Sequence, residues 1–126
     1  MATVGRIDTH HHIVPASYAS WLKRKGMEAG GMPIPEWSAD AAIALMDKFR
    51  IQTAIMSIST PGVHLGDDAE AREKAREVNE YAAEVVRKHS SRFGFFATLC
   101  LLTLRGHWMK SRMRSTSSRR RCRPAG

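Results

Sequence analysis

Cysteine is scarce in this sequence, and so are long apolar runs. Cys100 and Cys122 are the only cysteines among the 126 residues, and neither belongs to a Cys-x-x-Cys pair. Their spacing therefore indicates neither a disulfide framework nor a structural zinc site. No apolar stretch approaches the ~18 residues of a membrane span, and residues 1–6 lack the apolar core of a signal peptide. We expect a cytoplasmic protein with no membrane partner.

Acidic residues are missing from one part of the chain. The net charge is +8, from 20 Lys and Arg against 12 Asp and Glu. Residues 1–98 hold 12 of each kind, so the whole excess comes from the 8 basic residues of the remaining segment. A uniformly basic protein would suggest a nucleic-acid partner. This distribution instead predicts a neutral domain over residues 1–99 and a basic tail over residues 100–126, without a nucleic-acid partner.

The apolar pattern alternates between the periods of strands and helices. Short apolar runs predict buried strands, and apolar residues at spacings of three and four predict amphipathic helices. Strand, helix, strand, helix, strand is the order of a parallel α/β sheet. The expected elements are a strand over residues 3–7, a helix over 39–49 capped by Ser38, a strand over 53–58, a helix that follows Asp67, and a strand over 92–99.

Three adjacent histidines follow the first expected strand. In an extended chain, alternate side chains share a side, so His10 and His12 face one way and His11 the other. Two imidazoles so spaced can hold one metal ion, and the carboxyl end of a parallel strand is where such folds place their chemistry. A tag remnant or a solvated loop has the same local composition, and the spacing does not decide between these interpretations.

The residues around the histidines carry a resemblance. Ile7, Asp8, His10, His12 and Pro15 form the pattern Ile-Asp-x-His-x-His-x-x-Pro. This pattern resembles the opening of the amidohydrolase superfamily, in the amidohydrolase-related branch that includes aminocarboxymuconate-semialdehyde decarboxylase. The resemblance continues in order to about residue 99, through the segments at residues 35–38, 59–64, 78–82 and 92–99.

The resemblance implies a fold, a cofactor and a reaction class. The fold would be α/β, the first three or so βα units of a metal-dependent (β/α)8 TIM barrel, because a complete barrel needs roughly 250 residues. His10 and His12 would be the first two ligands of a divalent ion, expected to be zinc. The reaction would be hydrolysis, or non-oxidative decarboxylation, of a small carboxylate. The remaining ligands would lie beyond residue 126, so we expect this chain to be inactive, and whether to class it as an enzyme stays open.

Two further residues are candidates for lining a substrate site. Trp37 lies in the loop expected over the site, where it could wall a pocket or hold the loop to the barrel. His64 follows the second expected strand and could touch substrate, although a lone loop histidine is often simply solvated. Asp8 is expected to face away from the metal and to orient neighbouring groups.

The tail allows two interpretations. Its Arg and Ser content is typical of a disordered segment or of coding sequence read out of frame, and after Met109 a displaced frame permits a barrel-like helix. Alternatively, the chain is a small basic-tailed module that binds nucleic acid through its arginines, or a non-catalytic interaction module. A three-strand fragment would also leave an open sheet edge, so self-association is expected.

Overall fold

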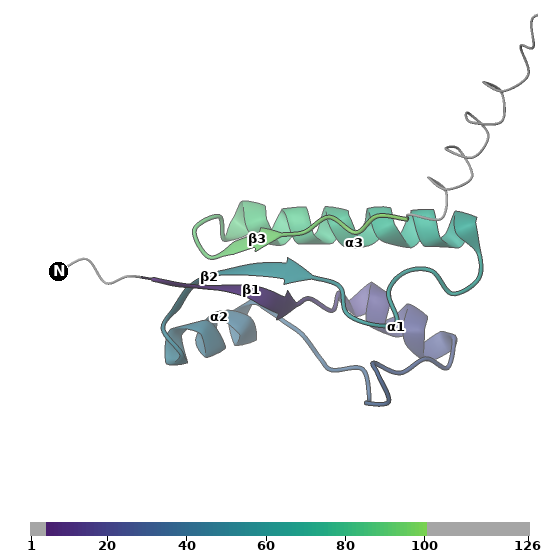
Figure 1. Cartoon of the computed structure of the whole chain (residues 1–126), viewed down its shortest axis with the longest axis horizontal. Helices are drawn as coiled ribbons and strands as arrows, with labels where there is room; N and C mark the ends of the chain where they lie inside the picture. The colour runs from purple at the N-terminus through teal and green to yellow at the C-terminus, as the bar shows by residue number, and fades with distance from the viewer. Residues whose placement is uncertain (1–4, 101–126) are drawn as a thin grey trace, which may run out of the picture.

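The computed structural model describes residues 5–100 (Figure 1). Within this range the three strands form one parallel sheet in the order β1-β2-β3, which confirms the predicted α/β alternation. Thr3 and Val4, placed in the first expected strand, lie outside the described residues. The elements are β1 (Arg6–His12), α1 (Ala16–Arg24), α2 (Ala39–Lys48), β2 (Ile51–Ser57), α3 (Asp68–Lys88) and β3 (Phe93–Phe95).

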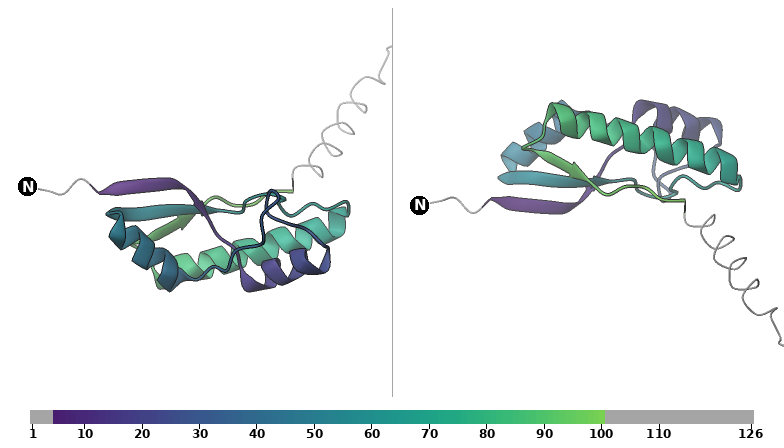
Figure 2. Two further views of the ribbon diagram at one scale, coloured as in Figure 1. Left: turned by 90° about the horizontal axis from the view of Figure 1, so that it is seen from below. Right: turned by 90° about the horizontal axis from the view of Figure 1, so that it is seen from above.

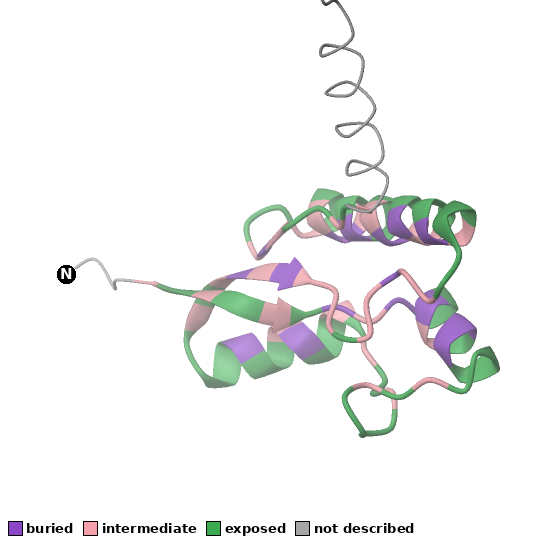
Figure 3. Cartoon of the chain, turned by 45° about the vertical axis from the view of Figure 1, so that its right-hand side comes forward, coloured by how far each residue is buried: buried purple, intermediate pink, exposed green. Residues whose placement is uncertain are grey.

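The molecule has two layers, the sheet and the helices. Both views in Figure 2 place all three helices on one side of the sheet, so its other face is bare. No residue of β1 is buried, and Ile7 is 65% exposed (Figure 3). The expectation of a first strand buried on both sides is therefore wrong. In the described chain β1 has one neighbouring strand and one face covered by helices. A strand buried on both sides needs a second neighbouring strand and a second covered face.

The helix-covered face of the sheet carries the first of two apolar clusters. The Ser38 hydroxyl accepts a hydrogen bond from the Ala41 amide at 3.2 Å, so α2 begins at the predicted cap. Leu45 and Phe49 continue the apolar spacing of Ala42 and Met46 in the sequence, but both are half-exposed. The buried members of this group, which we call the sheet cluster, are Ile13, Ala42, Met46, Ala54, Met56, Ala82, Val85 and Phe93.

A second cluster lies beyond the carboxyl ends of the strands, around α1. The Trp21 indole donates to Glu70 Oε1 at 3.0 Å, which ties α1 to α3. We call this group the α1 cluster; its buried members are Tyr18, Trp21, Leu22, Val63, Ala75 and Val78. The predicted stripe of α3 is confirmed, and its 21 residues serve both clusters, the amino-terminal half packing on α1 and the carboxyl-terminal half on the sheet.

The third strand is shorter than the pattern predicted. Pairing with β2 stops at Phe95, so the strand expected over residues 92–99 covers only three of them. The following segment bonds instead to α3. The Asn79 side chain donates to the Thr98 carbonyl at 3.0 Å and accepts from the Thr98 amide at 2.8 Å. A side-chain amide thus takes the place of a neighbouring strand as the hydrogen-bond partner of Thr98.

Two expectations from the sequence concern regions or properties beyond this fold. The basic tail, expected over residues 100–126, lies outside the described residues except for Cys100, so the out-of-frame segment stays a prediction. In the part of the chain that the structure describes, no helix has the length and apolar character needed to cross a bilayer.

Candidate metal and substrate site

The histidine run lies inside the first strand rather than after it. β1 continues to His12 because β2 extends to Ser57, and the backbones of His11 and His12 pair with Met56 and Ser57. The sequence placed the end of this strand at Ile7. The strand extends five residues further because its backbone pairs with β2. The apolar periodicity of the sequence does not reveal this pairing.

A register shift in β1 decides which side chains share a face. Between Asp8 and His11 two residues of β1 stand opposite the single residue of β2 that lies between Ala54 and Met56. This extra residue is a β-bulge, which reverses the alternation of side chains. Asp8 and His11 therefore lie on the face that packs on the helices, whereas His10 and His12 lie on the bare face.

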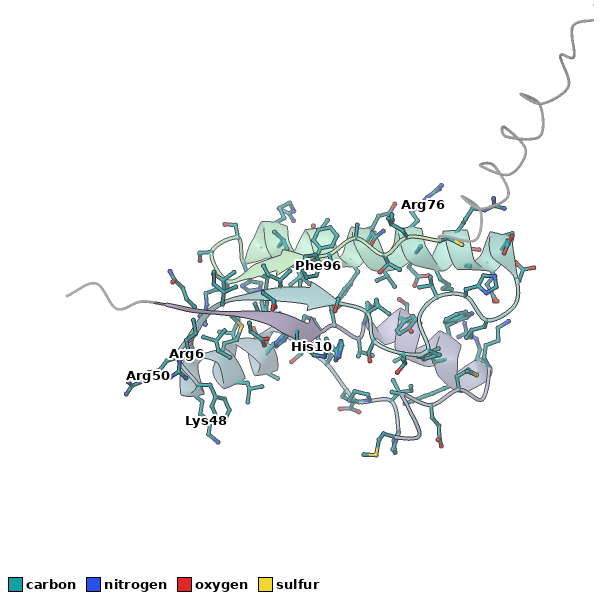
Figure 4. The ribbon with its side chains drawn as sticks, viewed as in Figure 1. Arg6, His10, Lys48, Arg50, Arg76 and Phe96 are labelled. Carbon is teal, nitrogen blue, oxygen red and sulfur yellow. The ribbon has the colours of Figure 1, made fainter. Side chains whose placement is uncertain are left out.

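His10 and His12 form a ring pair at the carboxyl end of β1. Their ring centroids lie 4.8 Å apart with an interplanar angle of 72°, and both residues are exposed (Figure 4 labels His10). The predicted facing of this pair is confirmed by the geometry. In residues 5–100 no third His, Cys, Asp or Glu completes a metal-binding group around it.

Asp8 holds the backbone beneath the ring pair. Its Oδ1 accepts from the His10 amide at 3.0 Å, and its Oδ2 lies 3.2 Å from His11 Nδ1. The hydrogen bond from the His10 amide, with smaller contributions from His11, lowers the pKa of the Asp8 carboxyl. His11 contacts the Phe93 ring with a centroid distance of 6.2 Å, and only 11% of its side chain is exposed. Asp8 thus fixes the chain where the strand presents its histidines.

An apolar cleft of about 310 Å³ opens beside His12. Three segments form it: the start of the β1–α1 connection and α1 itself, the loop that follows α1, and the turn after β2. Tyr18 lies on its wall, where burial raises the pKa of the phenol to about 12, and its hydroxyl donates to the Gly62 carbonyl at 2.8 Å. The lining residues are His12, Val14, Tyr18, Leu22, Ala29, Met32, Pro33, Ile34, Pro35, Ser59 and Thr60.

The two predicted substrate-lining residues lie outside this cleft. Trp37 packs on the sheet cluster, with its ring centroid 6.1 Å from that of Tyr81 and 6.4 Å from that of Phe93. This placement agrees with the alternative in which the aromatic ring holds the loop to the body. His64 lies just before α3, where its Nε2 is 2.9 Å from Asp68 Oδ1. Neither side chain joins His10 and His12, and a role at substrate stays a prediction for both.

The sequence interpretation missed the residues that do line the cleft. Tyr18 and Leu22 were visible only as an apolar helix face, the pattern of ordinary core residues. Ile34 and Thr60 come from loops without a periodic pattern. The one available signal was the group of helix-breaking residues Gly30, Gly31, Pro33 and Pro35, which indicated a loop over the site.

The fold and the histidine pair define a class. A parallel sheet in sequential order, covered by helices on one face and carrying its polar pair at the carboxyl end of the first strand, is the beginning of a (β/α)8 barrel. No family model matches the chain. The chain is similar to amidohydrolase II, with 31% identity and a TM-score of 0.70 over 74% of this chain and 31% of that one.

Individual relatives narrow the class to a family. Decarboxylase yanB of Aspergillus niger is 38% identical over 78% of this chain and 27% of its own length, and 6-methylsalicylic acid decarboxylase of Penicillium expansum is 31% identical over 76% and 30%. The manganese-bound dihydroxybenzoic acid decarboxylase of Polaromonas sp. JS666 shares 28% identity over 77% and 30%, with a TM-score of 0.60. The chain is thus similar to decarboxylases of the amidohydrolase superfamily. It spans less than a third of their length.

Proposed function

We propose that this chain carries the first part of a metal-dependent, non-oxidative decarboxylase of a small aromatic carboxylate. The observation that carries the proposal is the juxtaposition of the His10 and His12 ring pair with an apolar cleft at the same end of the sheet. Hydrolysis, the other reaction considered from the sequence, has less support, because the named relatives with a stated reaction are decarboxylases.

The ring pair fits a shared metal ion. Two imidazoles that bind one tetrahedral ion at ~2.1 Å have ring centroids roughly 5 Å apart, close to the 4.8 Å between His10 and His12. Both rings are also exposed on the bare face, where an ion can reach them. Two nitrogens are fewer than the three or four protein ligands of a catalytic centre. We propose that the remaining ligands come from barrel residues that this chain does not contain.

The identity of the ion belongs to the proposal. Zinc is the expectation from the imidazole ligands, whereas the dihydroxybenzoic acid decarboxylase of Polaromonas holds manganese. When bound, a divalent ion supplies a Lewis acid for the oxygen atoms around the substrate carboxylate. His10 and His12 would hold that ion, and Asp8 fixes the backbone of His10 from the other face of the strand.

The cleft supports an aromatic substrate. Its walls are mainly aliphatic and aromatic side chains, with few polar groups, which suits a benzene ring better than a polar chain. A benzene ring in this cleft would lie against Val14 and Leu22, with His12 on the same lining to face its carboxylate. The buried Tyr18 phenol, already engaged with the Gly62 carbonyl, would act as a wall rather than as an acid.

Metal binding by the 126-residue chain tests the site directly. We expect weak binding of Zn²⁺ or Mn²⁺ in calorimetry, because two ligands supply about half of a centre. The double variant His10→Ala/His12→Ala should abolish it. His64→Ala is the matched control, since His64 pairs with Asp68 away from the cleft, and it should leave binding unchanged. Binding that survives in the double variant would place the ion elsewhere.

A turnover assay tests completeness. With 6-methylsalicylate or 2,6-dihydroxybenzoate, we expect no product from this chain, because the described residues supply no complete ligand set. Turnover that disappears in His12→Ala would show that two histidines suffice. The tail requires a separate test: a displaced frame of the coding DNA should encode further barrel elements, and a frame that does not would end the out-of-frame interpretation.

The cytoplasmic location, the self-association through the open sheet edge and the nucleic-acid-binding alternative stay predictions. No contact within residues 5–100 favours the last of these over the decarboxylase proposal.

A further inference from the structure

Three arginines converge at the end of the sheet opposite to the histidine pair. Arg6 begins β1, Arg50 lies in the turn between α2 and β2, and Arg92 lies just before β3. All three line one open cleft of about 790 Å³. Figure 4 shows Arg6 and Arg50 close together at this end of the molecule, far from His10. Three cationic side chains from separate elements thus share one space.

Two of these guanidinium groups are held in place. Arg92 Nη2 donates to Asp47 Oδ1 at 2.6 Å, and its Nε donates to the Gln52 carbonyl at 3.1 Å. Arg6 Nη1 donates to the Phe49 carbonyl at 3.3 Å. These contacts orient the groups but leave most of their charge uncompensated. Among the described residues that line the cleft, Asp47 is the sole carboxylate, against three guanidinium groups.

Arg50 occupies a backbone position that favours another residue. Its φ is +56°, in the left-handed region, directly after Phe49, the C-cap of α2. Glycine is common at this position because it has no Cβ to be strained. Within residues 5–100 the Arg50 side chain forms no hydrogen bond or ion pair. The turn itself therefore does not account for an arginine there.

We propose that this cleft binds a small oxyanion with two or more negative charges, of the phosphate type. Guanidinium groups match the oxygen spacing of phosphate with paired N–H donors. Arg50 would provide the unengaged fork, and Arg6 and Arg92 would add the surrounding positive charge. The Gln52 amide and the Ser91 hydroxyl line the same cleft and can donate to the remaining oxygens. This site is independent of the proposed decarboxylase site.

The test is a titration of the 126-residue chain with inorganic pyrophosphate, by calorimetry at constant ionic strength set with NaCl. We expect saturable binding that Arg50→Gly weakens by about tenfold or more, while the same substitution raises the unfolding temperature because the backbone strain is removed. If pyrophosphate affinity falls while the unfolding temperature rises, the variant has lost a contact with the anion. A damaged fold would lower both quantities. Arg76→Ala, on the exposed side of α3 (Figure 4), is the charge-matched control and should change neither.

Other outcomes would overturn the proposal. Affinity equal to that for chloride, or affinity unchanged in Arg50→Gly, would show that Arg6 and Arg92 serve only to bond the end of α2 and the start of β2. A single-stranded oligonucleotide that binds the chain, loses affinity in Arg50→Gly and resists competition by pyrophosphate would make the cleft part of a nucleic-acid surface instead. Pyrophosphate-dependent thermal stabilisation serves as a second measurement, because it reports only on molecules that were folded before heating.

Discussion

The sheet cluster and the α1 cluster are built from different kinds of contact. The sheet cluster is apolar throughout, with Met46, Ala54 and Met56 fully buried between β2 and the helices. The α1 cluster surrounds its apolar members with hydrogen bonds from Tyr18 to Gly62 and from Trp21 to Glu70. The apolar periodicity of the sequence predicts the sheet cluster, which packs the helices onto the sheet. The second holds α1 at the cleft wall, so it has greater influence on what the site can bind.

The largest effect should come from emptying the sheet cluster. Met46→Ala should lower the free energy of unfolding by about 2–5 kcal/mol, because a fully buried side chain is replaced by a cavity. Leu45→Ala, one residue earlier on α2 and 50% exposed, should cost about 1 kcal/mol or less. Urea unfolding followed by tryptophan fluorescence measures both. Equal losses in the two variants would mean that α2 does not pack as described.

A pH-dependent effect should separate the α1 cluster from the sheet cluster. Tyr18→Phe should cost about 1 kcal/mol at pH 7, because the Gly62 carbonyl loses its donor. In the parent chain the unfolded state releases the phenolic proton near pH 10, whereas the folded state keeps it until about 12. Stability should therefore fall between these values by at most about 2.7 kcal/mol.

The Tyr18→Phe variant should not show this loss of stability at alkaline pH. Tyr81→Phe is the control on α3: it keeps the Tyr18 hydroxyl and should keep the loss. An identical alkaline profile in the parent chain and Tyr18→Phe would show that the phenol is not buried against Gly62.

The smallest effect should come from the charged rim of the α1 cluster. Lys25 Nζ lies 2.9 Å from Glu70 Oε2, but 44% of the lysine side chain is exposed. Solvent screens such a pair, so Lys25→Ala should leave the urea midpoint unchanged within error. Trp21→Phe removes the indole N–H bonded to the same carboxylate and should lower the midpoint measurably. A larger loss in Lys25→Ala would mean that charge, rather than packing, holds α1 in place.

The order of the elements and the parallel sheet were predictable from the sequence because burial imposes a period. The Ser38 cap was predictable too, since its side chain acts within three residues. The bulge in β1 was not, because no glycine or other local signal marks Thr9 and His10 as the extra pair. The arginine cleft was missed for a related reason: Arg50 and Arg92 follow helices in unremarkable turns, and only the sheet brings them together.

The site residues show the same limit. His10 and His12 were identifiable because both ligands stand on one strand, where sequence spacing translates into distance. The cleft beside them joins residues more than 40 positions apart, from Val14 to Thr60, and no spacing rule reaches that far. Trp37, in contrast, was conspicuous in sequence and lies with the sheet cluster, away from the cleft.

The sequential strand order has a consequence for how this part of the protein is made. Each strand pairs with the next one along the chain: Arg6 meets Ile51, 45 residues later, and Ala54 meets Phe93, 39 residues later. A polypeptide emerging from the ribosome amino-terminus first can therefore complete both pairings without any strand from further downstream. The segment that presents the histidines would be a co-translational folding unit, a template on which a longer chain adds its later strands.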